Sequence, residues 1–237
     1  MSPESPPLCD TTATFPAAAS HTGALATEPR IWDALARSTH TALVDTLEHF
    51  VGALAYAQRW TAGARADTGV LVVGPGGGAS VLATDACDRA GLTLTPTTAR
   101  ARSILEGMGF GAGTTVANPL EIPFGPAVPT DALRAVLTPL LREQPFADVL
   151  VHVNVSAYYG YGTEGIAPLV EQLRDLAATA VGDARVAVVL RNLAVAPGRE
   201  VETLVDAVSD AGLVTFTTFD EAAAAIAAMA RFTRARR

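Results

Sequence analysis

The sequence predicts an α/β fold, a doubly wound parallel sheet of about five strands with a helical extension on its N-terminal side. Two observations lead to this prediction. Beyond residue 68, short apolar runs alternate with longer amphipathic stretches that suit helices. Two of the apolar runs, at 149–151 and 186–190, are nearly continuous, which is typical of strands covered on both faces.

The N-terminal part is predicted to hold a leader and two helices. Residues 1–17 are rich in Pro, Ser, Thr and Ala without periodicity, so we expect them to be disordered. A helix is expected over 27–39, with Thr27 as its N-cap. A second helix is expected over 45–60, with Asp45 as its cap. Its apolar stripe consists of Leu47, Phe50, Val51, Leu54 and Ala55.

After a break at 61–67, strand and helix signals alternate to the end of the chain. The expected strands are 69–73, 92–95, 148–153, 185–190 and 214–217. The expected helices are 79–90, 97–107, 130–143, 164–180, 198–211 and 219–232. This alternation implies right-handed crossovers, and about five strands so connected are the flavodoxin-like pattern. Because such sheets bind ligands beyond the carboxyl ends of their strands, the loops 74–80, 154–163 and 191–198 are expected to line the site.

Composition limits the classes of function. The 237 residues are 49% hydrophobic and 17% charged, which suits a globular protein. A net charge of -7 and a pI near 5.0 argue against non-specific binding to nucleic acid or to a membrane surface. We find no secretory signal and no apolar run near the roughly 18 residues that span a bilayer. We therefore expect a soluble cytoplasmic protein.

Two residue types restrict the chemistry. All 17 cationic side chains are arginines, so Schiff-base chemistry and a lysine clamp on phosphates are excluded within this chain. The two cysteines, Cys9 and Cys87, have no metal-ligand spacing and form no disulfide framework. No metal site is predicted.

The loop at 74–80 is the first candidate site. It joins an apolar strand to a helix, and its glycines would let backbone amides at the helix start approach an oxyanion. The candidate phosphate-binding residues are Gly76, Gly77, Gly78, Ala79 and Ser80. The loop is neither a P-loop nor a dinucleotide fingerprint, because no Gly-Lys follows and Asp88 lies on the helix. A tight structural turn is the alternative.

His21 is the candidate catalytic residue. It stands among small residues, beside Ser20, Thr22 and Gly23, just ahead of a helix start. An imidazole in a loop is a suitable nucleophile for phosphoryl transfer. The alternative is an ordinary solvated histidine. His152, in the central strand, is either a hydrogen-bonded core histidine or a residue near the site.

Two further loops have open interpretations. Asn118 precedes a proline in an extended loop, and Glu121 there either orients an imidazole, contacts a partner or is simply solvated. Tyr158, Tyr159 and Tyr161 follow the third expected strand at the ligand edge. They form a lid, an aromatic platform or an ordinary surface loop.

Taken in order, several segments resemble the NDP-forming acyl-CoA synthetases, the superfamily of succinyl-CoA synthetase and ADP-forming acetyl-CoA synthetase. The resemblance is carried by residues 17–26, 44–48, 76–86, 90–92 and 118–121, and it extends over 17–232. Two departures are visible. The family's glycine-glycine-proline-glycine order is replaced by Gly-Pro-Gly-Gly-Gly, and its usual aspartate by Glu121.

The resemblance implies a relay. In that family a histidine on a mobile loop is phosphorylated by an acyl phosphate, or by ATP in reverse, and helix N-termini stabilise the phosphate. His21 matches that histidine, and the helix start at 77–80 matches one of those helices. The resemblance gives supporting roles to Ser20, Thr22, Gly23, Asn118 and Glu121.

The resemblance also implies partners. The family's CoA-binding and ATP-grasp domains have no counterpart here, so we expect subunits that carry them, or a homo-oligomer. ATP or ADP, Mg²⁺ and CoA would then bind through those partners, and the chain would be incomplete as a ligase. The alternative is a non-catalytic or repurposed module that binds a small acyl phosphate, phosphate or a partner.

We accordingly expect three parts. They are a disordered leader (1–17), a phosphohistidine-like loop with a helical extension (18–66), and a flavodoxin-like domain similar to that of succinyl-CoA synthetase (67–237).

Overall fold

The computed structural model describes residues 29–39, 41–59, 69–111, 114–160, 165–179 and 184–235. The chain divides into two compact units, Met1–Leu43 and Val44–Arg237. The first contributes helix α2 (Pro29–Thr39), in agreement with the helix expected over 27–39. Its apolar side chains Ile31, Trp32 and Leu35 are exposed within the structure. The expected cap, Thr27, lies outside the described residues.

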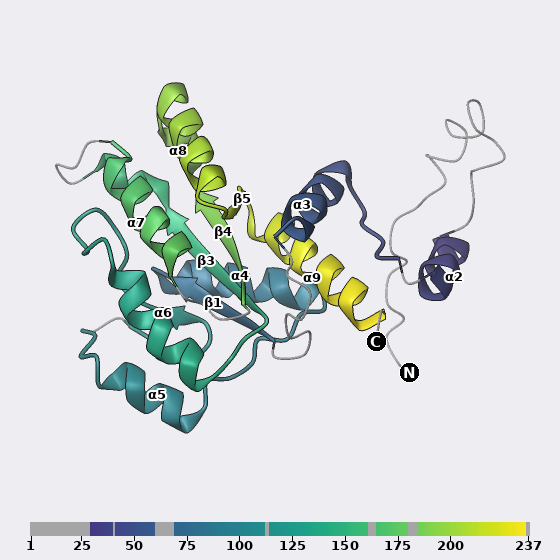
Figure 1. Ribbon diagram of the computed structural model, residues 1–237, viewed down its shortest axis with the longest axis horizontal. Coiled ribbons are helices and arrows are strands. Elements are labelled where there is room, and N and C mark those ends of the chain that lie inside the picture. The colour runs from purple at the N-terminus through teal and green to yellow at the C-terminus, as the bar shows by residue number, and fades with distance from the viewer. Residues whose placement is uncertain are drawn as a thin grey trace, which may run out of the picture. The chain divides into compact units, whose positions relative to one another are not determined.

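The second unit is built on a five-stranded parallel sheet in the order β2-β1-β3-β4-β5 (Figure 1). The strands are β1 (Val70–Gly74), β2 (Leu120–Glu121), β3 (Asp148–Asn154), β4 (Arg185–Arg191) and β5 (Val214–Phe216). This order confirms the predicted doubly wound, flavodoxin-like α/β fold.

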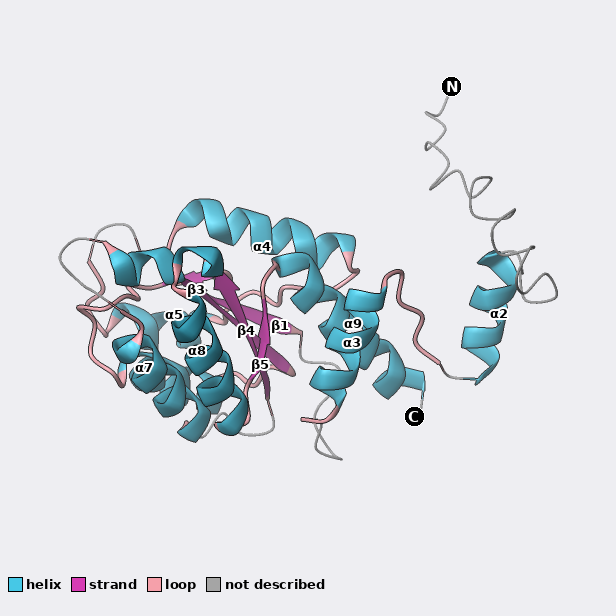
Figure 2. Ribbon diagram, turned by 90° about the horizontal axis from the view of Figure 1, so that it is seen from above, coloured by secondary structure: helices cyan, strands magenta, loops and turns pink. Residues whose placement is uncertain are grey.

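Helices cover both faces of the sheet. The helices on the first face are α4 (Gly77–Arg89) and α9 (Phe219–Ala235), and α3 (Leu47–Ala57) packs against α9. Those on the second face are α5 (Ala99–Glu106), α6 (Ala132–Glu143), α7 (Ala167–Ala178) and α8 (Gly198–Asp210). Short 3₁₀ helices η3 (Val155–Tyr159) and η4 (Leu193–Val195) follow β3 and β4. Figure 2 shows the sheet lying between α4 and the layer that contains α7 and α8.

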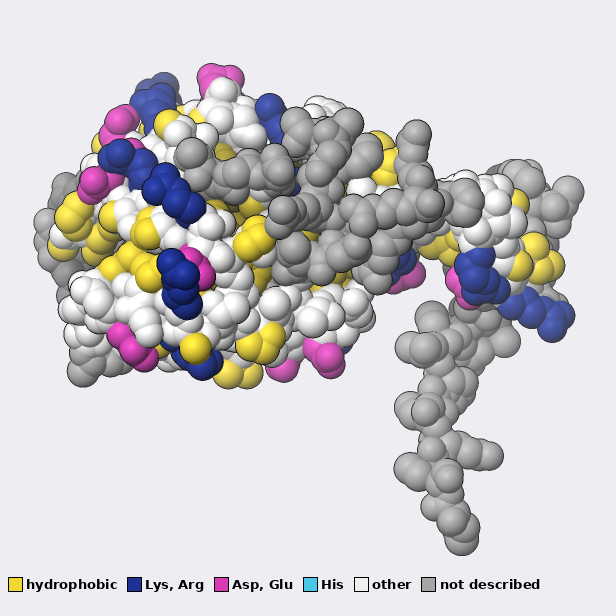
Figure 3. All heavy atoms as spheres, turned by 60° about the horizontal axis from the view of Figure 1, so that its bottom comes forward, with side chains coloured by type: hydrophobic (Ala, Val, Ile, Leu, Met, Phe, Trp, Pro, Cys, Tyr) yellow, Lys and Arg dark blue, Asp and Glu magenta, His cyan; other side chains and the backbone are white. Residues whose placement is uncertain are grey.

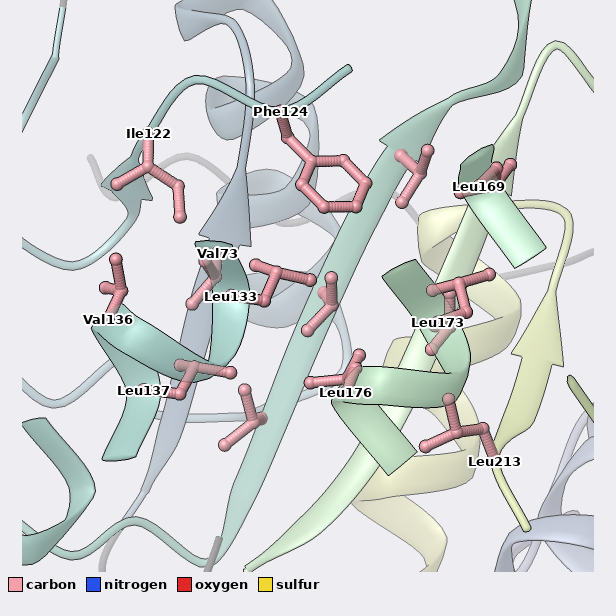
Figure 4. Close-up of a cluster of buried hydrophobic side chains, with 14 of the residues drawn as sticks. Val73, Ile122, Phe124, Leu133, Val136, Leu137, Leu169, Leu173, Leu176 and Leu213 are labelled. Carbon is pink, nitrogen blue, oxygen red and sulfur yellow. The ribbon is translucent and has the colours of Figure 1, made fainter. Parts of the chain in front are cut away.

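The core consists of two buried clusters, one on each face of the sheet. Side chains alternate along β3, so Val151 and Val153 enter one cluster and Leu150 enters the other. In the larger cluster, α6 and α7 insert leucines such as Leu137 and Leu173 over the strands (Figure 4). Burial on both faces is what the continuous apolar runs predicted.

One strand prediction is wrong. Residues 92–95 make only a single bridge, between Leu94 and Val70, and the second strand is Leu120–Glu121 instead. The reason is the amide side chain of Asn118, which accepts a hydrogen bond from the Val72 amide at 2.9 Å. Its Nδ2 also donates to the carbonyl oxygens of Val70 at 2.7 Å and Thr95 at 2.9 Å. This side chain pairs with the backbone groups of β1 that a second strand would otherwise use.

Buried hydrogen bonds hold helix α3 to the edge of the sheet where the strands begin. The Asp148 carboxylate accepts from the Tyr56 hydroxyl at 2.7 Å and from the Arg185 Nε and Nη2 at 2.7 and 2.8 Å. The expected cap of this helix, Asp45, is wrong by one residue. Thr46 is the N-cap, and its side chain accepts from the His49 amide.

The surface mixes both charges. On the face seen in Figure 3, arginine side chains of the described residues lie among acidic and hydrophobic ones. Within the described segments, no helix is both long and apolar enough to cross a membrane.

Candidate functional site

The predicted glycine loop, residues 74–80, lies at the carboxyl edge of the sheet. Strand β1 ends at Gly74, and the chain turns through Gly76 into α4. The Gly76 carbonyl accepts from the amides of Ala79 and Ser80 at 3.0 and 3.2 Å, which are the first bonds of the helix. Gly76 is the N-cap and provides no side chain to cap the first turn. The start of α4 therefore presents backbone amides and the positive end of the helix dipole.

The glycines of this loop allow an unusual backbone conformation and leave the surface of the loop open. Gly76 has a φ of 93°, a conformation that L side chains rarely adopt. A Cβ at Gly76 or at Gly78 would meet nothing within 4 Å, so open space lies over the loop. Among the predicted phosphate-binding residues, Gly76, Gly77 and Gly78 are exposed, whereas Ala79 and Ser80 are buried.

Ser80 is buried in the first turn of α4. Its hydroxyl lies 3.5 Å from the carbonyl oxygen of Gly76, within its own helix. Helix α9, the other helix on this face, is capped differently: the Thr218 hydroxyl accepts from the Glu221 amide, and the Glu221 carboxylate accepts from the Thr217 amide. That cap satisfies donors at the start of α9 with side chains, as in a capping box.

Glu121 lies beside the start of α4. It is in register with Gly74 across β1 and β2, and its Oε1 is 3.4 Å from where a Cβ of Gly77 would stand. The Thr115 hydroxyl is 3.4 Å from its Oε2. The structure thus brings one predicted supporting residue to the glycine loop. Asn118, the other one described, has its side chain engaged with the backbone of β1.

His152 lies directly beneath the loop. A Cβ at Gly74 would meet the backbone carbonyl oxygen of His152 most closely and would stand 2.6 Å from the Cε1 and Nδ1 of its ring, so only glycine fits there. The ring meets Phe219 edge-on, with centroids 5.4 Å apart. His152 is fully buried, and neither ring nitrogen has a hydrogen-bond partner among the described residues. The prediction of a core histidine is right about burial, but the expected hydrogen bond is not made to any described residue.

Burial and the charge of Arg191 lower the pKa of His152 to about 3. The imidazole is therefore neutral at pH 7, with one N–H donor and one acceptor nitrogen. It can hydrogen-bond without adding a charge to this edge of the sheet.

Arg191 is the functional candidate that sequence reasoning missed. It ends β4, in register with Asn154, and its Nε is buried with no hydrogen-bond partner in the described parts of the chain. Burial lowers the pKa of its guanidinium. The available signal was its place, a charged residue directly after the apolar run 186–190.

The loops after β3 and β4 are tied together beside Arg191. The Asn154 Oδ1 accepts from the Ser156 hydroxyl at 2.8 Å and from the Asn192 Nδ2 at 2.9 Å. Asn192 has a φ of 57°, the left-handed conformation that asparagine tolerates better than most residues.

The tyrosines after β3 are structural where they are described. Tyr158 is fully buried and donates to the Gln172 Oε1 at 2.6 Å. Tyr159 donates to the Glu200 Oε2 at 2.6 Å, which joins η3 to α8. This overturns the lid and platform interpretations for these two residues, and Tyr161 lies outside the described residues.

The predicted phosphoryl carrier, His21, lies outside the described residues, as do Ser20, Thr22 and Gly23. Within the part of the chain that is described, no group of three or more His, Cys, Asp or Glu side chains is arranged to hold a metal ion.

A hollow elsewhere on this unit has a cavity volume of about 410 Å³. Its lining includes Leu47, Val51 and Ala55 of α3 and Phe216 of β5. None of the predicted site residues lines it, so we place the candidate site at the glycine loop.

The fold and this loop define a doubly wound α/β protein with a glycine-rich helix start at the ligand edge. No protein-family model and no curated protein sequence matches the chain. Similar solved structures include dinucleotide forming Acetyl-coenzyme A synthetase 1 of Ca. Korarchaeum cryptofilum in complex with phosphate and ADP. It is 20% identical with a TM-score of 0.74, and the match covers 95% of this chain and 46% of that one.

The apo form of that synthetase is 18% identical with a TM-score of 0.73, covering 95% of this chain and 45% of that one. PH0766 from Pyrococcus horikoshii OT3 is 15% identical with a TM-score of 0.70, covering 87% and 44%. The chain spans less than half the length of each. At these identities the likeness shows a shared fold, which agrees at fold level with the acyl-CoA synthetase resemblance.

Proposed function

We propose that this chain is the phosphoryl-handling part of an acid–thiol ligase of the NDP-forming acyl-CoA synthetase type, as a subunit or split domain. The observation that carries the proposal is the glycine-rich start of α4 at the ligand edge. It occurs in a fold shared, over 95% of this chain, with an acetyl-CoA synthetase solved with phosphate and ADP.

In this proposal His21 carries the phosphoryl group. An imidazole nitrogen forms the P–N bond while the P–O bond of an acyl phosphate breaks and the carboxylate leaves. The same histidine then passes the phosphoryl group to a nucleoside diphosphate. The chain's own part in each step is to hold the phosphoryl oxygens at the backbone amides of Gly77 and Gly78, where the helix dipole favours negative charge.

Glu121 has a defined task in this proposal. Its carboxylate lies beside the start of α4, within reach of a group bound there. It accepts a hydrogen bond from the imidazole of His21 and so holds the ring in one tautomer and orientation. Ser20, Thr22 and Gly23 shape the loop that brings His21 to this point.

The remaining chemistry belongs to partners. ATP or ADP, Mg²⁺ and CoA bind through CoA-binding and ATP-grasp subunits, or through other copies in a homo-oligomer. The absence of lysine from the chain supports this division, since lysine commonly clamps nucleotide phosphates. We place the assembly in the cytoplasm, with no nucleic acid or membrane among its partners.

Phosphohistidine labelling tests the proposal. The chain is mixed with candidate CoA-binding and ATP-grasp subunits and ATP labelled at the γ-phosphate. We expect an acid-labile label that is lost in His21→Ala and kept in the control His49→Ala. A label of the same size in His21→Ala would overturn the role of His21.

One observation favours a second function, a repurposed module that binds a ligand or a partner without catalysis. The Glu121 carboxylate is itself an anion beside the start of α4, 3.4 Å from the Cβ position of Gly77. A carboxylate there compensates the helix dipole without any phosphate. Complex formation with the partners, without label on any histidine, would support this module.

A further inference from the structure

His152 is fully buried and Arg191 is partly buried, and both contain buried side-chain nitrogens without a hydrogen-bond partner among the described residues. Of the four buried side-chain atoms without a hydrogen-bond partner in the described segments, three belong to this pair. The fourth is Nη1 of Arg185, whose guanidinium is otherwise bound to Asp148. Native proteins leave few buried polar groups unpaired, so two adjacent ones call for a functional reason.

Both side chains lie on the face covered by α4 and α9. Along β4, Ala187 and Val189 belong to the cluster of that face, so alternation assigns Arg191 to it as well. His152 contacts Phe219, the first residue of α9, and lies two residues away from Arg191 in strand register. The two residues therefore lie on one face of the sheet, near the carboxyl ends of two neighbouring strands.

The pair lies behind the glycine loop. The ring of His152 fills the space that Gly74 leaves, and the chain turns from Gly74 over this same face into α4. The three glycines of the turn are exposed and carry no side chains. The start of α4 and the pair therefore lie on the same face of the sheet, at the carboxyl ends of its strands.

The charges select the class of ligand. Arg191 contributes a permanent positive charge, and none of the ion pairs found among the described residues includes it. His152 is neutral and contributes one donor and one acceptor. A phosphate ion satisfies both groups, because its oxygens accept from a guanidinium and its protonated oxygen can donate to a ring nitrogen.

We propose that His152 and Arg191 form the floor of a phosphate-binding site whose rim is the start of α4. Arg191 compensates the charge of the phosphate, and His152 fixes its orientation through a hydrogen bond. This inference rests on the proposed function only in taking phosphate as the ligand. It does not require phosphorylation of His21.

Calorimetric titration of the full chain with inorganic phosphate tests the role of Arg191. We expect Arg191→Gln to weaken phosphate binding at least tenfold and Arg191→Lys to weaken it less. The matched control, Arg199→Gln, changes an exposed arginine on α8 and should bind like the wild type. Binding by Arg191→Gln within twofold of the wild type, or no phosphate binding by the wild type, would overturn the proposal.

Nitrogen NMR of the histidine side chains tests His152 directly and keeps the proposal falsifiable if Arg191→Gln does not fold. The His152 signals are assigned by their loss in His152→Gln. Saturating phosphate should shift both His152 nitrogens in the wild-type chain. Unmoved signals at saturation would overturn the proposal.

The experiments distinguish failure of the phosphoryl-carrier proposal from failure of the phosphate-site proposal. Label on a histidine that does not depend on His21, together with phosphate binding that depends on Arg191, would overturn only the phosphoryl-carrier role. If the label depends on His21 but phosphate binding is unchanged in Arg191→Gln, only the proposed phosphate-binding role of Arg191 and His152 would be overturned.

Discussion

The two ends of β4 carry the same residue type on the same face of the sheet, with opposite surroundings. Arg185 begins the strand opposite Asp148, and Arg191 ends it opposite Asn154. Asp148 and Arg185 form a buried pair, their side chains 4% and 1% exposed. Asn154 is neutral and bonds to Ser156 and Asn192 instead, so Arg191 has no anion across the ladder.

The pKa directions follow the surroundings. Burial lowers the pKa of Arg185, but the hydrogen bonds and charge of Asp148 outweigh it, so the pKa is raised. Burial alone acts on Arg191, whose pKa is lowered. The difference teaches that the amino end of the sheet is built for stability. At the carboxyl end, buried nitrogens of His152 and Arg191 have no hydrogen-bond partner among the described residues, which costs stability.

The largest expected effect is at the amino end. Asp148→Ala leaves Arg185 as an uncompensated buried charge and removes the acceptor of Tyr56, so we expect the unfolding free energy to fall by about 3–5 kcal/mol. Urea denaturation measures this. The control Asp206→Ala removes an exposed carboxylate from α8 and should change it by less than about 0.5 kcal/mol. A loss equal to the control's would contradict the stabilising role of this end.

The next effect is at the carboxyl end. Gly74→Ala places a Cβ against the backbone carbonyl oxygen of His152 and 2.6 Å from two of its ring atoms, and overpacking of this kind costs about 1–3 kcal/mol. Gly78→Ala is the matched control, because open space surrounds its Cβ position. In a double-mutant cycle, His152→Ala should recover part of the loss. Full additivity of the two changes would show that the ring does not impose glycine at position 74.

The pH dependence of stability should separate the two ends further. The pKa of His152 is lowered from 6.5 to about 3 in the folded chain, so the unfolded chain binds more protons between those values. The contribution of His152 is complete above pH 6.5 and is lost as pH falls toward 3. Between pH 7 and pH 5 we expect a loss of about 2 kcal/mol.

Urea denaturation at pH 7 and at pH 5 measures this contribution as the difference between the wild type and His152→Gln. An identical loss in both proteins would assign the acid sensitivity to other groups.

The smallest effect has the opposite sign. Arg191→Met removes a partly buried charge that has no ion pair with the described residues, so the unfolding free energy should rise by about 1 kcal/mol. The same change at the other end, Arg185→Met, removes the cation beside the buried Asp148 carboxylate and should lower the unfolding free energy. Thermal melting of both variants gives the signs. If both variants are destabilised, the claim that the two arginines contribute to stability with opposite sign is wrong.

Much of the fold could be predicted because its signals are local. The apolar runs and helix periods marked every strand except one, and the glycine loop was recognised at its correct place between β1 and α4. The second strand could not be predicted. Residues 92–95 are apolar enough to pair with β1. The side chain of Asn118 instead makes hydrogen bonds to the backbone of β1, at Val70 and Val72.

The candidate site was predictable in part. The glycines and Glu121 were singled out by type and order, and the structure brings them together. His152 left two interpretations open, because burial and hydrogen bonding depend on what packs over a strand. Arg191 was missed, since an arginine after an apolar run resembles any solvated strand end. The role of His21 stays a prediction.

The sequence by itself determined the alternation of strands and helices, the two covered faces of the sheet and the position of the glycine-rich helix start. These follow from periodicity and backbone freedom within a few residues. Only the tertiary structure decided that Asp148 pairs with Arg185, that the Nε of Arg191 has no hydrogen-bond partner among the described residues, and that His152 fills the space left by Gly74. The physical reason is that a buried group's partner is set by the register between strands far apart in the chain.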